Sequence, residues 1–334
     1  MLVEFAPVLL FVAHAATAAP PASVVERIDG VAITVADLDR SVAFFTDVLD
    51  FRLLGREERA GDDVEHVEGV FGARLAVARL ALGDERIELV QFTAAPGRPL
   101  PADARGNDRI FQHIAIVVRD MREAFDRVHA SGVTQASNEP QTLPVWNQKA
   151  GGIEAFYFRD PDLHWLELIR FPAGKGDPRW QTANGGVFLG IDHTAIVVDD
   201  TERALGFWRD ELGLEIVGGS ENYGVEQEHL NGVFGARLRI TTLHAKRGIG
   251  VELLDYLSPC DGRPAPADLR ANDVAHWWTL GAGDPDRVDE STRRGVPRWV
   301  SPGVVGSGER AAISLRDPDG HGVLVQRVPN EQGN

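Results

Sequence analysis

Runs in which apolar and polar residues alternate recur along the chain, and each is followed by an acidic turn and a segment with helical spacing. The first run, IDGVAITV, begins at Ile28, and apolar residues then recur every three or four positions from Val42 to Leu49. The later stretches RLAVARLAL, from Arg74, and RIELVQF, from Arg86, are rich in apolar and β-branched residues and predict strands. The unit therefore reads strand, helix, then strands.

This unit belongs to a duplicated half. The stretch EHVEGVFGARL, from Glu65, matches EHLNGVFGARL, from Glu228, 163 positions later. The same offset aligns Gly30 of IDGVAITV with His193 of IDHTAIVV. The chain therefore consists of two tandem halves.

Each half divides again into two modules. The segment FQHIAIVVRDMREAFDRVHASGV has the same order of strand, acidic turn and helix as the segment that opens the first half. The offset of 163 also aligns its His113 with His276 of VAHWWTL. The even modules close with FYFRDPDLHWLELIRF and ISLRDPDGHGVLVQRV, in which Asp-Pro-Asp predicts a turn between two strands.

The boundaries of these units follow from composition. Residues 1–22 hold an apolar run followed by small residues, which is typical of a signal peptide and predicts export to the periplasm or outside the cell. A cytoplasmic location follows if the leader is not a signal. We predict the first half at 23–172, a linker rich in Gly and Pro at 173–189, and the second half at 190–330.

Composition restricts the partners. Acidic residues outnumber basic ones by 50 to 34, a net charge of −16, which disfavours nucleic acid and anionic membrane surfaces and favours a small-molecule substrate. The apolar leader is too short to span a bilayer. Cys260 is the only cysteine, so a metal would have to be held by His and carboxylate side chains. A monomer and a homodimer are both compatible with these features.

Polar residues interrupt the apolar strands at recurring places. Histidines occur in the first strand of three modules, and glutamates occur in the last strand of three modules. They are His113, His193 and His276, and Glu88, Glu167 and Glu252. The corresponding places in the first and fourth modules hold Gly30 and Leu324. A carboxylate in an apolar strand needs a compensating positive group, and a divalent ion is one.

The organisation resembles the vicinal oxygen chelate superfamily, which includes glyoxalase I, type I extradiol dioxygenases and bleomycin resistance proteins. The resemblance rests on the paired openings IDHTAIVV and FQHIAIVV, the phrases SVAFFTDVLDF and ALGFWRDELGL, and the closing DPDLHWLEL. It implies an α+β fold of four βαβββ modules, paired so that curved sheets form cups. It also implies that the recurring His and Glu places are metal-ligand positions for Fe, Mn, Ni or Zn.

The module pairing decides which ligands meet. If modules pair one with two and three with four, the sets are Glu88, His113 and Glu167, and His193, Glu252 and His276. If the outer modules pair and the inner modules pair, the inner site gains His113, Glu167, His193 and Glu252, while the outer site keeps only Glu88 and His276. We favour the second pairing because it gives one complete metal site and one vestigial site.

The resemblance implies a divalent-metal enzyme that chelates a small oxygenated molecule and transfers a proton, as lyases, isomerases and epimerases do, with Glu252 or Glu167 as the base. One alternative is an Fe(II) extradiol-type dioxygenase, since Tyr157 lies ten residues before Glu167 as in the closing extradiol motif. Another is a non-catalytic small-molecule-binding protein. Tyr157, His66 and His229 are predicted to line the pocket.

Overall fold

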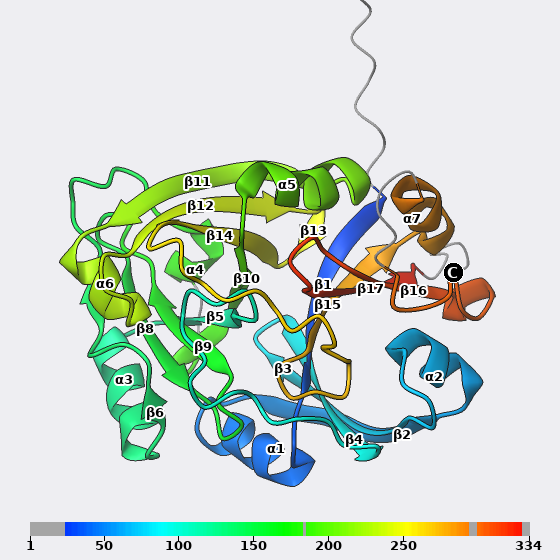
Figure 1. Cartoon of the computed structure of the whole chain (residues 1–334). Coiled ribbons are helices and arrows are strands. Elements are labelled where there is room, and N and C mark those ends of the chain that lie inside the picture. The colour runs from blue at the N-terminus through cyan, green and yellow to red at the C-terminus, as the bar shows by residue number, and fades with distance from the viewer. Residues whose placement is uncertain (1–23, 183–184, 294–298, 329–334) are drawn as a thin grey trace, which may run out of the picture.

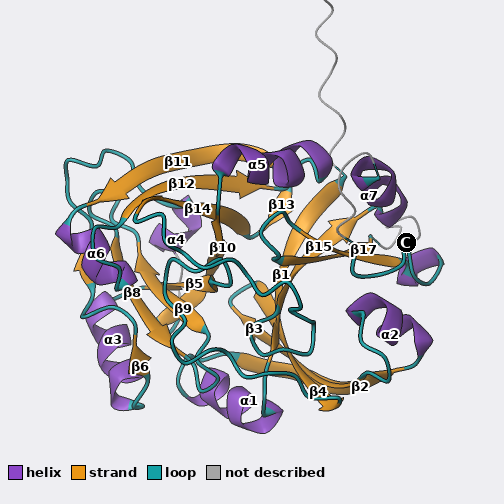
Figure 2. Ribbon diagram, viewed as in Figure 1, coloured by secondary structure: helices purple, strands orange, loops and turns teal. Residues whose placement is uncertain are grey.

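The computed structural model describes residues 24–182, 185–293 and 299–328, which form an α+β fold of two strongly curved sheets with helices on their outer sides (Figures 1 and 2). The predicted signal peptide, residues 1–22, lies outside the described residues. No helix within the described ranges is long and apolar enough to cross a bilayer.

The first helix of each module begins at an aspartate whose carboxylate accepts a hydrogen bond from a backbone N–H in the first turn, which satisfies a donor that the helix leaves free. These N-caps are Asp37, Asp120, Asp200 and Asp284. The helices they open are α1 (Leu38–Asp47), α3 (Met121–Ala130), α5 (Thr201–Leu205) with its π-helical continuation Gly206–Glu211, and α7 (Pro285–Thr292). The acidic turns of the sequence pattern are therefore helix starts.

The first sheet combines modules one and four and has the strand order β16-β17-β15-β1-β4-β3-β2, with β13 beside β1. The strands are β1 (Val25–Thr34), β2 (Arg52–Ala60), β3 (Arg74–Leu82), β4 (Glu85–Ala94), β13 (Arg247–Gly248), β15 (Trp277–Gly283), β16 (Ala312–Arg316) and β17 (Gly322–Arg327). A short helix, α2 (Asp62–Glu68), lies between β2 and β3, and a 3-10 turn, Gly308–Arg310, precedes β16.

The second sheet combines modules two and three in the order β11-β12-β14-β10-β5-β9-β8-β6, with β7 beside β8. The strands are β5 (Gln112–Val118), β6 (Thr134–Gln135), β7 (Gln141–Thr142), β8 (Glu154–Arg159), β9 (Trp165–Arg170), β10 (Phe188–Val198), β11 (Glu215–Tyr223), β12 (Arg237–His244) and β14 (Gly250–Ser258). Helix α6 (Val225–Asn231) matches α2, and α4 (Pro178–Thr182) lies in the segment predicted as a linker. The favoured pairing, outer with outer and inner with inner, is confirmed.

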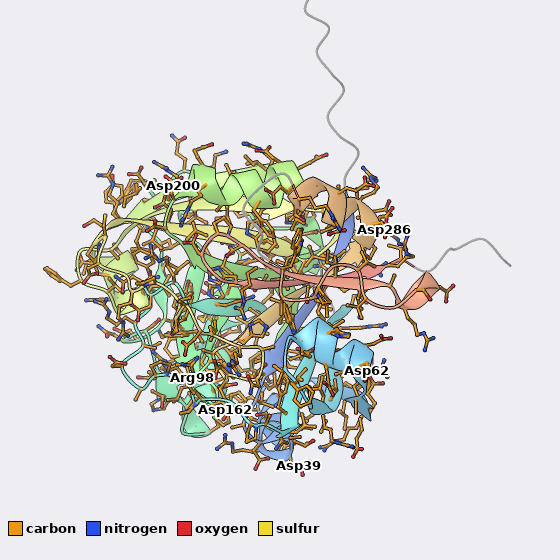
Figure 3. All side chains as sticks on the ribbon, turned by 45° about the vertical axis from the view of Figure 1, so that its right-hand side comes forward. Asp39, Asp62, Arg98, Asp162, Asp200 and Asp286 are labelled. Carbon is orange, nitrogen blue, oxygen red and sulfur yellow. The ribbon has the colours of Figure 1, made fainter. Side chains whose placement is uncertain are left out.

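Crossing segments connect the two sheets. Arg98, labelled in Figure 3, donates to the buried carboxylate of Asp273 at 2.7 Å, and Arg263 donates to that of Asp108 at 2.6 Å. Each of the two inter-module segments therefore supplies an arginine to a carboxylate of the other. Gly97 shows how close they come, since a Cβ there would lie 2.1 Å from the carbonyl oxygen of Asn272. These contacts tie each half to the other.

The strand register corrects one alignment made from the sequence. In the inner sheet, His113 pairs with Ala195. The outer-sheet residue that matches Ala195 is Ala32, and it pairs with Trp278. The motif RGND before β5 and the motif RAND before β15 give the same alignment without a gap. Trp278 therefore occupies the place of His113. His276 lies two residues earlier, so the alignment of His276 with His113 is wrong.

Four buried clusters divide the interior of the described residues, and the smallest joins Ala115, Val117, Ile169 and Trp180. The largest packs the helices against the convex sides of both sheets and includes Phe45, Phe156 and Trp208. A second cluster lines the concave side of the inner sheet, here called the inner cup, and includes Phe111, Tyr157 and Trp165. A third lines the concave side of the outer sheet, called the outer cup. The two cups have equivalent backbones but different contents.

Candidate metal centre in the inner cup

The central four strands of the inner sheet bring polar residues to one concave face. His193 on β10 pairs with Ala115 on β5, which in turn pairs with Glu167 on β9. Side chains on facing positions of adjacent strands point to the same side of a sheet. One ligand atom from each of His113, Glu167 and His193 lies within 4.8 Å of the other two, and all three residues are buried.

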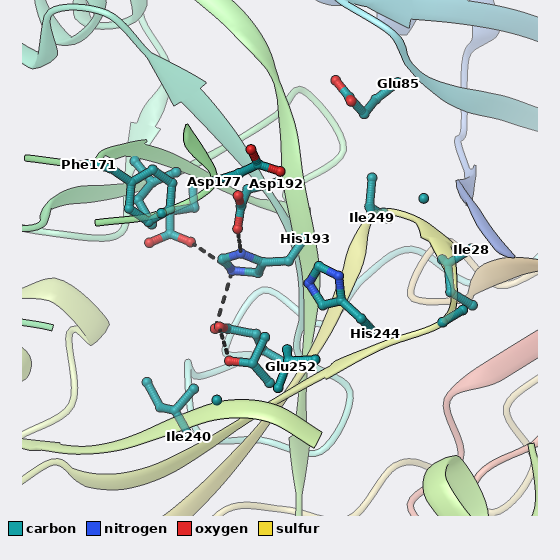
Figure 4. A pocket seen from close by; sticks show the side chains of 18 of the residues that line it. Ile28, Glu85, Phe171, Asp177, Asp192, His193, Ile240, His244, Ile249 and Glu252 are labelled. Atoms are coloured by element: carbon teal, nitrogen blue, oxygen red, sulfur yellow. Dashed lines mark hydrogen bonds and ion pairs between the residues drawn. The ribbon is translucent and has the colours of Figure 1, made fainter. Parts of the chain in front are cut away.

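Glu252 lies beside this group on β14. Its Oε2 is 3.4 Å from Nε2 of His193, and its Oε1 accepts a hydrogen bond of 2.8 Å from the hydroxyl of Thr242 on the neighbouring strand β12. Its side chain is 20% exposed, against 7% for Glu167. Glu252 is therefore held at the edge of the buried group and faces the cavity (Figure 4).

The charges of this cluster are unbalanced. Burial alone would lower the pKa of His193, but the neighbouring carboxylates of Glu252, Asp192 and Glu167 raise it well above its ordinary value. Burial would raise the pKa of Glu167, but the imidazoles of His113 and His193 outweigh it and lower that pKa. Three carboxylates thus surround a single imidazole, an arrangement that stabilises a positive charge at this point.

The donor set fits a divalent transition metal. Two imidazole nitrogens with carboxylate oxygens and no thiolate suit Fe, Mn, Ni or Zn. Nε2 of His113 lies 3.0 Å from Oε2 of Glu167, yet neither ring nitrogen of His113 has a hydrogen-bond partner within the described part of the chain. A buried imidazole without partners is costly. An ion held between His113, Glu167 and His193 would give Nε2 of His113 a partner.

A cavity of about 1610 Å³ opens from this cluster. Near the cluster its walls include Tyr157, Leu143 and Ile153, and farther away it reaches residues of the outer sheet such as Arg86. Burial and the neighbouring Glu167 raise the pKa of Tyr157 well above 10, so its phenol stays neutral. The cavity exceeds the usual volume of a small-molecule site, about 300–1000 Å³. It therefore has room for a substrate larger than the group that reacts.

The outer cup holds apolar side chains where the inner cup holds the candidate ligands. Trp278 and Leu324 occupy the places of His113 and Glu167, and they pack against apolar residues of β3 and β4. Glu88 survives at the place of Glu252, but Arg59 binds it with two hydrogen bonds of 2.8 and 2.9 Å. Glu88 is thus neutralised by a side chain of the protein.

One residue of the predicted vestigial site, His276, needs correction. His276 is buried beside Trp278, with ring centroids 4.3 Å apart. Burial lowers its pKa well below 6.5, so His276 is a neutral core residue. It does not occupy the ligand place on β15, which Trp278 takes. Gly30 cannot be replaced simply by histidine. Its φ is +145°, and a Cβ would lie 2.0 Å from the carbonyl oxygen of Arg86.

Sequence reasoning also placed two histidines at the pocket. His66 on α2 and His229 on α6 are exposed, and neither is among the residues that line the cavity in the described part of the structure. Tyr157 does line it. The sequence reasoning missed Thr242 and Asp192. Asp192 directly precedes His193 in the sequence, and its carboxylate is 3.0 Å from Nδ1 of that histidine.

Comparison with known proteins agrees with this architecture. The family model described as Glyoxalase/Bleomycin resistance protein/Dioxygenase superfamily matches residues 27–168 and 190–325. A 2-epi-5-epi-valiolone epimerase of Actinomyces sp. is 34% identical over 151 residues, which cover 43% of this chain and 79% of the epimerase. A lactoylglutathione lyase of Salmonella typhimurium is 29% identical over 148 residues, covering 43% of this chain and 93% of the lyase.

A solved structure extends the likeness to nearly the whole chain. Glyoxalase I from Zea mays superimposes with a TM-score of 0.57 at 17% identity and covers 90% of this chain and 92% of its own. At this identity the likeness concerns the fold alone. It shows that a four-module chain of this kind has a solved counterpart.

Proposed function

The chain belongs to the Glyoxalase/Bleomycin resistance protein/Dioxygenase superfamily, and from this premise we propose that it is a divalent-metal-dependent enzyme that moves a proton on a small oxygenated substrate in the inner cup. The observation that carries the proposal is the convergence of His113, Glu167 and His193 beside Glu252. The names of its relatives, an epimerase and a lyase, support chemistry of this class.

The residues of the site have two proposed roles, metal ligand and catalytic base. His113, Glu167 and His193 would hold the ion, because one ligand atom of each lies within 4.8 Å of the other two. When bound there, a divalent ion would polarise two adjacent substrate oxygens and acidify the neighbouring C–H. Glu252 is the proposed base, since Thr242 occupies its Oε1 and leaves a lone pair of Oε2 for the proton.

Proton transfer then follows from the position of Glu252. Its Oε2 accepts the carbon-bound proton and returns it to the neighbouring atom, which is isomerisation. Epimerisation by the same oxygen requires the planar intermediate to turn over in the cup before the proton is returned to the carbon that lost it. Tyr157 and Leu143 contribute apolar surface to the cavity that Glu252 faces. Because Tyr157 stays neutral, its ring adds no charge that would compete with the carboxylate.

Metal content tests the proposal. We expect about one equivalent of a divalent metal in protein purified without chelators, a large loss in His113→Ala and His193→Ala, and full retention in His276→Ala, which is the matched control. A wild-type protein without metal, or His113→Ala protein with unchanged metal, would refute the site.

Deuterium exchange tests the chemistry. The metal-loaded protein is incubated in D2O with a panel of α-hydroxy ketones, including hydroxyacetone and dihydroxyacetone, and the carbon-bound protons are followed by NMR. We expect accelerated exchange that Glu252→Gln abolishes while it keeps its metal. Bound metal without any exchange would favour a binding protein, and turnover that requires O2 would favour an extradiol-type dioxygenase.

A further inference from the structure

The second ring nitrogen of His193 has a partner outside the candidate metal centre. Nε2 of the ring faces Glu167 and Glu252, at 3.6 and 3.4 Å, and Nδ1 lies 3.0 Å from Oδ2 of Asp192. A carboxylate that accepts a hydrogen bond from Nδ1 leaves the lone pair on Nε2, which is the state a metal ligand requires. Figure 4 shows Asp192 and Glu252 on opposite sides of the ring.

Asp192 is itself held by the segment between the two halves. The indole N–H of Trp180, on α4, donates a hydrogen bond of 2.7 Å to Oδ1 of Asp192. The Trp180 ring lies directly against β10 at Gly190, where a Cβ would come within 2.7 Å of Cη2. A side chain at position 190 would therefore push the indole away from Asp192.

A second contact fixes α4 to the outer sheet. The guanidinium of Arg179 stacks over the Trp180 ring, 3.9 Å from its centroid, and donates to Oε1 of Glu85 at 2.5 Å. The other oxygen of Glu85, a buried residue of β4, accepts a hydrogen bond of 3.1 Å from the backbone N–H of Ile191. Glu85 thus contacts both α4 and the strand that carries Asp192 and His193.

The outer cup provides an internal comparison. Asp29 is the counterpart of Asp192, but it precedes Gly30 instead of a histidine and forms an ion pair with Arg27. The carboxylate is therefore present in both cups, whereas the contacts with an imidazole and an indole occur in the inner cup. This difference follows the division between the outer cup and the candidate metal centre.

We infer that Asp192 and Trp180 are positioning residues for the metal centre, so that the segment between the halves, fastened to the outer sheet through Arg179 and Glu85, orients His193 for coordination. The inference rests on the proposed function, because it concerns a ligand of the proposed metal. It assigns a task to α4, which the sequence had marked only as a linker. Among metalloproteins, loss of such a supporting carboxylate weakens metal binding about 10- to 100-fold.

The test measures Co²⁺ binding by the full-length protein in competition with a chelator. Asp192→Asn has one amide oxygen, which can accept from Trp180 or from Nδ1 of His193 but not replace both carboxylate oxygens, and we expect its Kd for Co²⁺ to rise about 10- to 100-fold. Trp180→Phe keeps the ring but lacks the donor, and we expect a rise of about fivefold. Asp29→Asn is the matched control and should bind as the wild type does.

Two further readouts separate positioning from a merely structural role. The visible absorption spectrum of bound Co²⁺ should change in Asp192→Asn, and the unfolding midpoint of the metal-free variant should stay close to that of the wild type. Wild-type affinity with an unchanged spectrum in Asp192→Asn would overturn the positioning role alone. Failure of the wild-type protein to bind Co²⁺ would instead overturn the proposed function, and the positioning role with it.

Discussion

Glu68 gives the sharpest prediction about stability. This carboxyl group is buried in the outer cup, where Oε2 accepts a hydrogen bond of 2.9 Å from the indole N–H of Trp278. Burial raises its pKa from 4.5 to about 7, and the hydrogen bond from Trp278 and the charge of Arg59 offset only part of that rise. The folded protein therefore binds a proton at Glu68 more tightly than the unfolded chain does.

The sign and size of the effect follow from that difference. Below pH 4.5 the group is protonated in both states and the folded protein bears no penalty. As the pH rises from 4.5 to about 7, the unfolded chain loses its proton first, so stability falls across this interval. Each pH unit of difference corresponds to about 1.4 kcal/mol, so the total is about 3 kcal/mol.

Glu68→Gln removes the ionisation and keeps an oxygen that can accept from Trp278. We expect the variant to exceed the wild type in free energy of unfolding by up to about 3 kcal/mol at pH 8, and the two curves to converge toward pH 4.5. The assay is urea unfolding from pH 4.5 to 8 with a chelator present, so that metal binding does not contribute. Glu58→Gln, on an exposed position of β2, controls for the lost charge. A difference between Glu68→Gln and wild type that does not change with pH would refute the reasoning.

Two other substitutions test separate features. Gly30→Ala should lower the free energy of unfolding by about 2 kcal/mol or more, because φ is +145° and the new Cβ meets the Arg86 carbonyl; a loss below about 0.5 kcal/mol in urea would contradict this. The buried Asp160 raises the pKa of His164 even though burial opposes the charged form, so this pair stabilises the fold fully below pH 6.5 and less as the pH rises through the raised value. Thermal melts of Asp160→Asn should therefore show its largest deficit at pH 6 and a smaller one at pH 9, and an equal deficit at both would count against the pair.

The reach of sequence reasoning is clearest in the inner cup. His193 and Glu252 stand out because each interrupts an apolar strand, and burial of such groups needs compensation whatever the strand's neighbours are. Their partners could not be derived in the same way. Thr242 supports Glu252 only because β12 pairs with β14 in the observed register, and no periodicity in either strand encodes that contact.

The case of His276 shows how local likeness can mislead. His276 lies 163 positions after His113, which is the offset of the strong repeat around α2 and α6. The second half, however, has two more residues between α6 and β15 than the first half has between α2 and β5. The motifs RGND and RAND contain the correct alignment. Only the hydrogen-bonded pairing of β15 with β1, in which Trp278 lies opposite Ala32, shows which residue faces the cup.

The sequence by itself determined the local elements and their fourfold repetition, because helix starts at residues such as Asp37 and the alternation of strands depend on neighbours a few positions away. Tertiary structure decided the pairing of modules, the placement of Trp278 in the outer cup, and the contact between Trp180 and Asp192. The physical reason is distance along the chain. Each module could bury its apolar face against either neighbour, and contacts between distant segments, such as that of Arg98 with Asp273, hold the chain in one of the two arrangements.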